Sequence, residues 1–113
     1  MKKTFGNILK ELRKSKGISQ RDLADKIGVD FSYISKVEND RLPPPAADTI
    51  VRICKVLNVP TEVLLAESGK VSSNITELIG SSQEAIKFML EASDMNLTND
   101  EWKNLTYKLK RLR

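Results

Sequence analysis

Two short amphipathic segments, separated only by a tight turn at Gly28 and Val29, constrain this 113-residue chain more than any other feature. Apolar residues recur at helical spacing on both sides of the turn, and their side chains would pack into one core: Leu23, Ile27, Val29, Ile34 and Val37. Two helices that cross steeply over so short a turn need a small residue where they touch, which Ala24 supplies. The turn needs a residue that tolerates positive φ, which Gly28 supplies. The pattern predicts a pair of short helices at about residues 20–27 and 31–39.

Three further helices are predicted around this pair, at about residues 5–16, 47–57 and 61–67. Residues that favour N-cap positions precede three of the five helices: Thr4, Ser19 and Asp30. In the fifth helix we expect Val63 and Leu64 to face inward. The proline run 43–45 cannot be helical and predicts an extended connector. Together these elements predict a compact all-α domain of five helices over residues 1–68.

The remaining residues, 69–113, begin with the composition of a linker. Capping-box spacing occurs twice beyond it, at Ser81 with Glu84 and at Thr98 with Glu101. This spacing predicts two helices, at about Gln83–Ala92 and Asn99–Leu112. A shorter helical piece over Ile75–Ile79 is a candidate to precede them.

The last predicted helix carries an apolar stripe at 3-4-3 spacing: Trp102, Leu105, Leu109 and Leu112. Ile86, Met89 and Leu90 form a second apolar face on the helix before it. Two amphipathic helices cannot bury both faces by themselves. Either they pack back on the first domain or they pair with another copy of the chain, so the stripe is a candidate dimerisation surface.

The positive charge of the chain lies in its first part. Residues 1–66 carry 12 basic and 8 acidic side chains, whereas residues 67–113 carry 7 of each, and the net charge of the chain is +4. A positive excess attracts polyanions, so the first part is where we expect one to bind.

Several classes of protein are disfavoured by the composition. The chain has no histidine and one cysteine, Cys54, so it lacks the commonest general base and cannot form a structural zinc site or an internal disulfide. No nucleophile–base pair can be assembled, and we expect no enzyme, no metal and no cofactor. No apolar h-region follows the basic start, and no run reaches the roughly 18 apolar residues of a membrane span. We therefore expect a cytoplasmic protein without membrane association.

The segment Ser19-Gln20-x-x-Leu23-Ala24 is followed by Ser32-Tyr33-Ile34-Ser35-Lys36-Val37-Glu38. This combination resembles the Cro/C1-type (xenobiotic-response-element) helix-turn-helix family, and the likeness covers about Ile8 to Leu65. The resemblance implies a lambda-repressor-like domain of five helices that binds double-stranded DNA. It also implies that the helix around Phe31 to Glu38 is a recognition helix, which enters the major groove.

The resemblance implies roles for individual residues. Gln20 would touch a phosphate and brace the recognition helix, and Asn39 and Arg41 would contact phosphates from the loop after it. Arg13 and Glu38 match a buried ion pair between the first and third helices. Three positions of the recognition helix would face base edges: Phe31, Ser32 and Lys36. Two would lie near the DNA backbone: Tyr33 and Ser35.

The sequence departs from the family pattern at two positions. Asp40 stands where the family usually has glycine, and an acidic side chain beside phosphates is unfavourable. Phe31 replaces a polar residue at the first reading position, where it cannot hydrogen-bond a base but can pack on thymine methyl groups.

The leading interpretation is a sequence-specific DNA-binding regulator of transcription, a repressor that acts as a homodimer on a near-palindromic operator. The C-terminal helical pair is similar in layout to that of Sin-type repressors. Within this interpretation a phage or stress-type repressor and an antitoxin-type autorepressor both stay open. A protein antagonist and a toxin are the candidate protein partners. A protein-interaction adaptor that has lost DNA binding also stays open, and the modest charge, Phe31 and Asp40 favour it.

Overall fold

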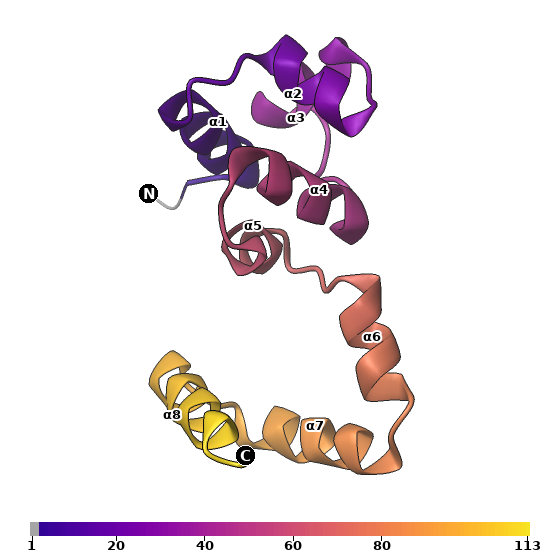
Figure 1. Cartoon of the computed structure of the whole chain (residues 1–113), viewed down its shortest axis with the longest axis vertical. Coiled ribbons are helices and arrows are strands. Elements are labelled where there is room, and N and C mark those ends of the chain that lie inside the picture. Colours follow the sequence, from indigo (N-terminus) through magenta and orange to yellow (C-terminus); the bar gives the residue numbers. More distant parts are fainter. Residues whose placement is uncertain (1–2) are drawn as a thin grey trace. The chain divides into compact units, whose positions relative to one another are not determined.

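The computed structural model describes residues 3–113, and these residues form eight α-helices and the connections between them (Figure 1). In chain order they are α1 (Phe5–Ser15), α2 (Gln20–Ile27), α3 (Phe31–Glu38), α4 (Ala47–Leu57), α5 (Thr61–Ser68), α6 (Ser73–Gly80), α7 (Gln83–Met95) and α8 (Asn99–Lys110). The chain divides into two compact units, one that extends up to Ile75 and one from Thr76 to Arg113. The predicted all-α fold class is confirmed for the described residues.

The first unit is built around one hydrophobic core to which each of α1 to α5 contributes. Its largest fully buried aliphatic side chains are Leu9, Leu23, Ile34, Ile50, Ile53, Leu57 and Leu64. Burial of one such side chain stabilises a fold by about 1.5–3 kcal/mol. Because α3 packs against both α1 and α2, its inner face is fixed while its outer face stays open.

Cys54 lies in this core on α4 and is fully buried. Burial is the main cause that raises the pKa of the Cys54 thiol above its ordinary value. The protonated thiol therefore acts as a small apolar core residue, as the sequence predicts.

Three of the predicted helix starts are confirmed by their side-chain caps. The Thr4 hydroxyl accepts a hydrogen bond from the backbone N–H of Asn7 at the start of α1. Ser19 caps α2 in the same way. Thr98 and Glu101 form a complete capping box at the start of α8.

The predicted N-cap position of Asp30 is confirmed, although without a capping hydrogen bond, and the predicted inward position of Val63 is wrong. Asp30 precedes α3 but makes no capping bond, because its carboxylate instead accepts a hydrogen bond from the Ser32 hydroxyl at 3.0 Å. Val63 is 39% exposed rather than inward-facing. The buried and half-buried residues of α5 follow i, i+3, i+4, i+7 spacing and form its inner face: Thr61, Leu64, Leu65 and Ser68. Val63 does not belong to this face.

The predicted cap of α7 is wrong by one residue. Ser82, not Ser81, accepts the capping hydrogen bond, from the backbone N–H of Ala85 at 3.2 Å. The hydroxyl of Ser81 instead donates to the Leu78 carbonyl at the end of α6. Glu84 therefore lies one position too early to complete a capping box.

The segment with linker composition is held against the first unit. The ammonium group of Lys70 donates to the carbonyls of Pro44 and Pro45 at 3.0 and 2.9 Å. Ser73 donates from its backbone N–H and its hydroxyl to the carboxylate of Asp48, near the start of α4. These bonds explain why the first compact unit extends seven residues past residue 68, to Ile75.

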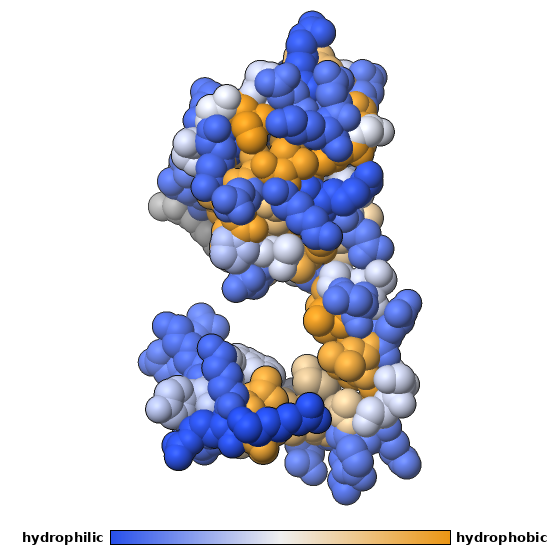
Figure 2. Space-filling model, in the orientation of Figure 1, coloured by the Kyte–Doolittle hydropathy of each residue, from blue (hydrophilic) through white to orange (hydrophobic). Residues whose placement is uncertain are grey.

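The helices beyond the first unit leave much of their apolar surface exposed. Within the described part of the second unit, Ala92 is the one buried residue. Figure 2 shows hydrophobic side chains on the visible face of α6. Leu78, a residue of this helix, is 66% exposed. Monomers rarely carry such surface uncovered.

Candidate nucleic-acid interface

The turn between α2 and α3 has the geometry that its sequence predicts. Gly28 lies in the left-handed region at φ 76°, and its backbone N–H donates to the Ala24 carbonyl at 2.9 Å. The N–H of Val29 donates to the same carbonyl at 3.0 Å. A residue with a side chain would be strained at this φ, so glycine permits the chain to reverse within two residues.

A buried ion pair fixes the inner side of α3. The Nε of Arg13 donates to Oε2 of Glu38 at 2.6 Å, and its Nη2 donates to Oε1 at 2.9 Å. The remaining guanidinium nitrogen donates to the Ile18 carbonyl at 2.8 Å. The amide of Gln20 also donates to Oε1 of Glu38, at 2.9 Å. This network confirms the predicted ion pair, and with the bond from Gln20 it ties α1 and the start of α2 to the end of α3.

Opposite this network, α3 presents an outward face. Phe31 is 39% exposed, Lys36 is exposed, and Ser32 and Ser35 are half-buried. These four positions follow the i, i+1, i+4, i+5 spacing of a single helix face. Tyr33 lies on the flank, half-buried against the hydrophobic core.

The loop after α3 holds Asp40 in a backbone conformation that favours glycine, the residue that the family resemblance leads us to expect at this position. The φ of Asp40 is 59°, in the left-handed region that favours glycine. Its carboxylate accepts a hydrogen bond from the Thr4 hydroxyl at 2.9 Å and so lies beside the start of α1. The backbone N–H of Arg41 donates to the Lys36 carbonyl at 2.8 Å, and the side chains of Asn39 and Arg41 are exposed.

Known proteins share both this geometry and this sequence. A family model described as helix-turn-helix matches residues 9–64. A crystal structure of SinR, described as the master regulator for biofilm formation, in complex with DNA is 35% identical and covers 55% of this chain and 98% of that chain, with a TM-score of 0.51. This chain belongs to the Cro/C1-type helix-turn-helix family.

Two further relatives extend the comparison beyond the helix-turn-helix domain. The uncharacterised HTH-type transcriptional regulator RghRB of Bacillus subtilis is 34% identical over 79 residues, which are 70% of this chain but 57% of that protein. The chain thus spans little more than half the length of RghRB. A chain of the SinR protein/SinI protein complex is 27% identical and covers 96% of this chain and 97% of that chain, with a TM-score of 0.53. The predicted likeness to Sin-type regulators therefore includes the C-terminal helices.

One residue of the helix-turn-helix domain that the motif does not single out also lies at the exposed face. The guanidinium carbon of Arg21, on α2, lies 4.7 Å from the centroid of the Phe31 ring. The two residues are ten positions apart on different helices, so helical periodicity carries no signal of their contact. The sequence indicates a role for Arg21 only in that an arginine occupies an exposed position beside Gln20.

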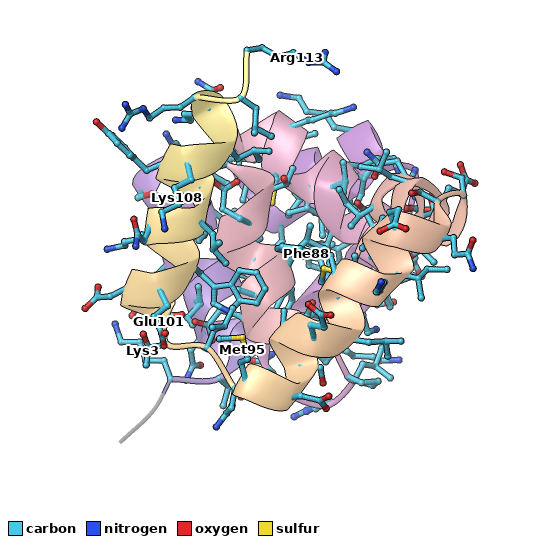
Figure 3. All side chains as sticks on the ribbon, turned by 90° about the horizontal axis from the view of Figure 1, so that it is seen from below. Lys3, Phe88, Met95, Glu101, Lys108 and Arg113 are labelled. Carbon is cyan, nitrogen blue, oxygen red and sulfur yellow. The ribbon has the colours of Figure 1, made fainter. Side chains whose placement is uncertain are left out.

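Three of the candidate dimerisation residues, Trp102, Leu105 and Leu109, lie on α8. Leu112 lies two residues past the end of α8 at Lys110, so the predicted extent of this helix to Leu112 is wrong. Trp102, Leu105, Leu109 and Leu112 line an open apolar pocket of about 340 Å³ together with Phe88 of α7. Figure 3 shows Phe88 on α7 and Lys108 on α8, the two helices that form this pocket. Trp102, Leu109 and Leu112 are 39%, 64% and 77% exposed.

Residues 3–113 contain neither a metal-binding cluster nor a membrane-spanning helix. No group of histidine, cysteine or acidic side chains is arranged to hold a metal ion. None of the described helices is long and apolar enough to cross a membrane.

Proposed function

We propose that this protein is a sequence-specific regulator of transcription that represses by occupying a near-palindromic operator as a homodimer. In this proposal α3 enters the major groove and places Phe31, Ser32 and Lys36 against base edges. Five residues hold the DNA backbone: Gln20, Tyr33, Ser35, Asn39 and Arg41.

The observation that carries the proposal is the contrast between the two sides of α3. Its inner side is fixed by the hydrophobic core and by the buried pair of Arg13 and Glu38. Its outer side presents one charged side chain, Lys36, and Arg41 follows in the adjoining loop. Neither cation has an ion-pair partner within the described part of the chain. A rigid helix with free donors and cations is suited to a polyanion whose groove it fits. The DNA complex of SinR supports the same interface in a relative.

A homodimer follows from the size of the site that one helix can read. One recognition helix contacts only a few base pairs, and a two-fold pair doubles the site. The exposed stripe on α8 offers a self-complementary surface for such a pair. The two recognition helices would then contact half-sites about 34 Å apart, or a multiple of this distance.

The proposal includes a protein partner and a cellular setting. The SinR protein/SinI protein complex shows that a relative of similar layout binds a second protein. We propose an antagonist of this kind for the present chain, and a toxin that co-purifies with it would instead indicate an antitoxin. The protein would act in the cytoplasm, as a binding protein rather than an enzyme.

Binding to random-sequence duplex DNA at several salt concentrations tests the proposal. A dimer that makes roughly 6–10 phosphate contacts should lose affinity by about 10³- to 10⁵-fold between 50 and 200 mM salt. Arg41→Ala should weaken binding to all sequences and reduce the salt dependence. Lys55→Ala is the matched control, because it removes one exposed cation from α4, which carries no candidate residue.

The adaptor interpretation gives the opposite results. An adaptor with the same fold would bind DNA weakly, with an affinity that hardly changes with salt. Arg41→Ala and Lys55→Ala would then be indistinguishable.

A further inference from the structure

Arg21 and Phe31 form one exposed stack at the start of the recognition helix. Arg21 is the second residue of α2 and Phe31 is the first residue of α3, so their contact bridges the turn between the two helices. The guanidinium carbon lies 4.7 Å from the ring centroid, within the range of a cation–π interaction. Both side chains are exposed.

The stack leaves the binding groups of both side chains available. Within the described residues, the guanidinium of Arg21 has no hydrogen-bond acceptor and no ion-pair partner. Its five N–H donors are therefore free, and the ring of Phe31 limits the directions in which their plane can turn. The ring in turn is covered by the guanidinium on one side and keeps 39% of the residue's surface open to solvent.

The two groups complement two different features of a base pair edge. A planar arginine fork donates two parallel hydrogen bonds to O6 and N7 of guanine, which is the commonest specific contact in the major groove. An aromatic ring can pack against the C5 methyl group of thymine. Successive base pairs are about 3.4 Å apart along the helix axis, so two stacked groups can reach neighbouring pairs.

We propose that Arg21 is a specificity-determining residue, and that Arg21 and Phe31 together read a guanine and a thymine at adjacent base pairs of each half-site. Arg21 donates to O6 and N7 of the guanine, and Phe31 packs on the methyl group of the thymine. The inference rests on the function proposed above and adds to it a residue from α2 and a two-base-pair element of the operator.

Selection of duplexes from a random pool by the full-length chain tests this inference. The wild type should enrich a motif that contains adjacent guanine and thymine. Arg21→Ala should lose the preference for guanine and keep the rest of the motif. Arg21→Lys should weaken the preference for guanine, because an ammonium group can donate to guanine but lacks the planar fork that stacks on the Phe31 ring. Lys55→Ala, the matched charge-removal control, should enrich the wild-type motif.

Single-atom changes in the best selected duplex sharpen the test. Replacing the guanine by 7-deazaguanine removes N7, and replacing the thymine by deoxyuracil removes the methyl group. Loss of a bidentate contact costs about 5- to 150-fold in affinity, so 7-deazaguanine should weaken wild-type binding by up to this factor. The same change should leave Arg21→Ala unaffected, and deoxyuracil should leave Phe31→Ala unaffected.

Three outcomes overturn the inference, and the third of them also overturns the proposed function. If Arg21→Ala weakens binding to every sequence equally, Arg21 contacts a phosphate and does not read a base. If Arg21→Lys selects the wild-type motif and binds it with unchanged affinity, the planar fork stacked on Phe31 is not what reads the guanine. If the wild-type chain enriches no sequence at all, the proposed function fails together with the inference.

Discussion

The carboxylate of Glu38 is held by the guanidinium of Arg13 through two hydrogen bonds, of 2.6 and 2.9 Å, inside the helix-turn-helix domain. Glu38 is 1% exposed and Arg13 is 6% exposed. Removal of one partner from such a pair leaves the other charge buried and unpaired. We expect Glu38→Ala to lower the free energy of unfolding by about 3–5 kcal/mol, measured by urea denaturation.

Glu11→Ala is the matched control for this prediction. It also removes a glutamate from an ion pair, with Lys3, but both of those side chains are about 60% exposed. Exposed pairs contribute about 0–1 kcal/mol, so the urea midpoint should hardly move. Equal midpoints for the two variants would contradict the role given to Glu38.

Gly6 lies where α1 approaches the end of α3 closely. A Cβ at this position would lie 2.7 Å from the backbone carbonyl oxygen of Glu38, and it would also meet the carbonyl of Val37. Because backbone atoms cannot move aside cheaply, Gly6→Ala should destabilise the fold by about 1–3 kcal/mol or more. Gly80→Ala, in α6, is the control: a Cβ there meets nothing within 4 Å, and the melting temperature should be unchanged or slightly higher.

The sequence predicted elements whose signals are local. Thr4, Ser19 and Gly28 mark the ends of α1 and α2 correctly, because a cap or a left-handed turn depends on residues within one helical turn. The cap of α7 is predicted one residue too early because either serine, Ser81 or Ser82, could accept the capping hydrogen bond. In the structure the hydroxyl of Ser81 donates to a carbonyl at the end of α6, and Ser82 caps α7.

Helical periodicity and capping patterns do not predict contacts between residues that are distant in the sequence. Lys70 reaches the carbonyl of Pro44, 26 residues away, so a segment with linker composition is held in place. Arg21 meets Phe31 only because the turn folds α2 against α3. The outward face of α3, in contrast, could be predicted, because its inner residues follow helical spacing. The DNA-binding roles proposed for the residues of that face rest on the family resemblance and not on helical spacing.

Asp40 offers a change that should strengthen DNA binding. Asp40→Asn keeps an oxygen that can accept from Thr4, and asparagine tolerates the positive φ of this position. The change removes a negative charge from the loop that is proposed to lie beside phosphates. We expect affinity for random duplex DNA at low salt to rise by about two- to fivefold per protomer. Unchanged affinity would place the loop away from the DNA.

The bonds of Lys70 and Ser73 predict where the first unit can be cut. A truncation after Ile75 keeps their contacts with Pro44, Pro45 and Asp48, whereas a truncation after Ser68 removes them. The longer fragment should therefore melt at a higher temperature than the shorter one. Lys70→Met in the longer fragment should bring its melting temperature toward that of the shorter one. Identical melting curves for the two fragments would mean that these bonds contribute nothing to stability.

The last prediction concerns the apolar stripe formed by Trp102, Leu105 and Leu109 on α8 together with Leu112 just beyond the helix. If two copies cover it by pairing, the full chain should sediment as a dimer and the fragment that ends at Ile75 as a folded monomer. The fragment should bind a two-half-site operator much more weakly, because the second half-site is no longer reached by a linked copy. Leu109→Ser in the full chain should favour the monomer, whereas Thr106→Ser, a milder change on the same pocket wall, should not. A full chain that sediments as a monomer, or a fragment that still dimerises, would show that α8 is not the dimerisation surface.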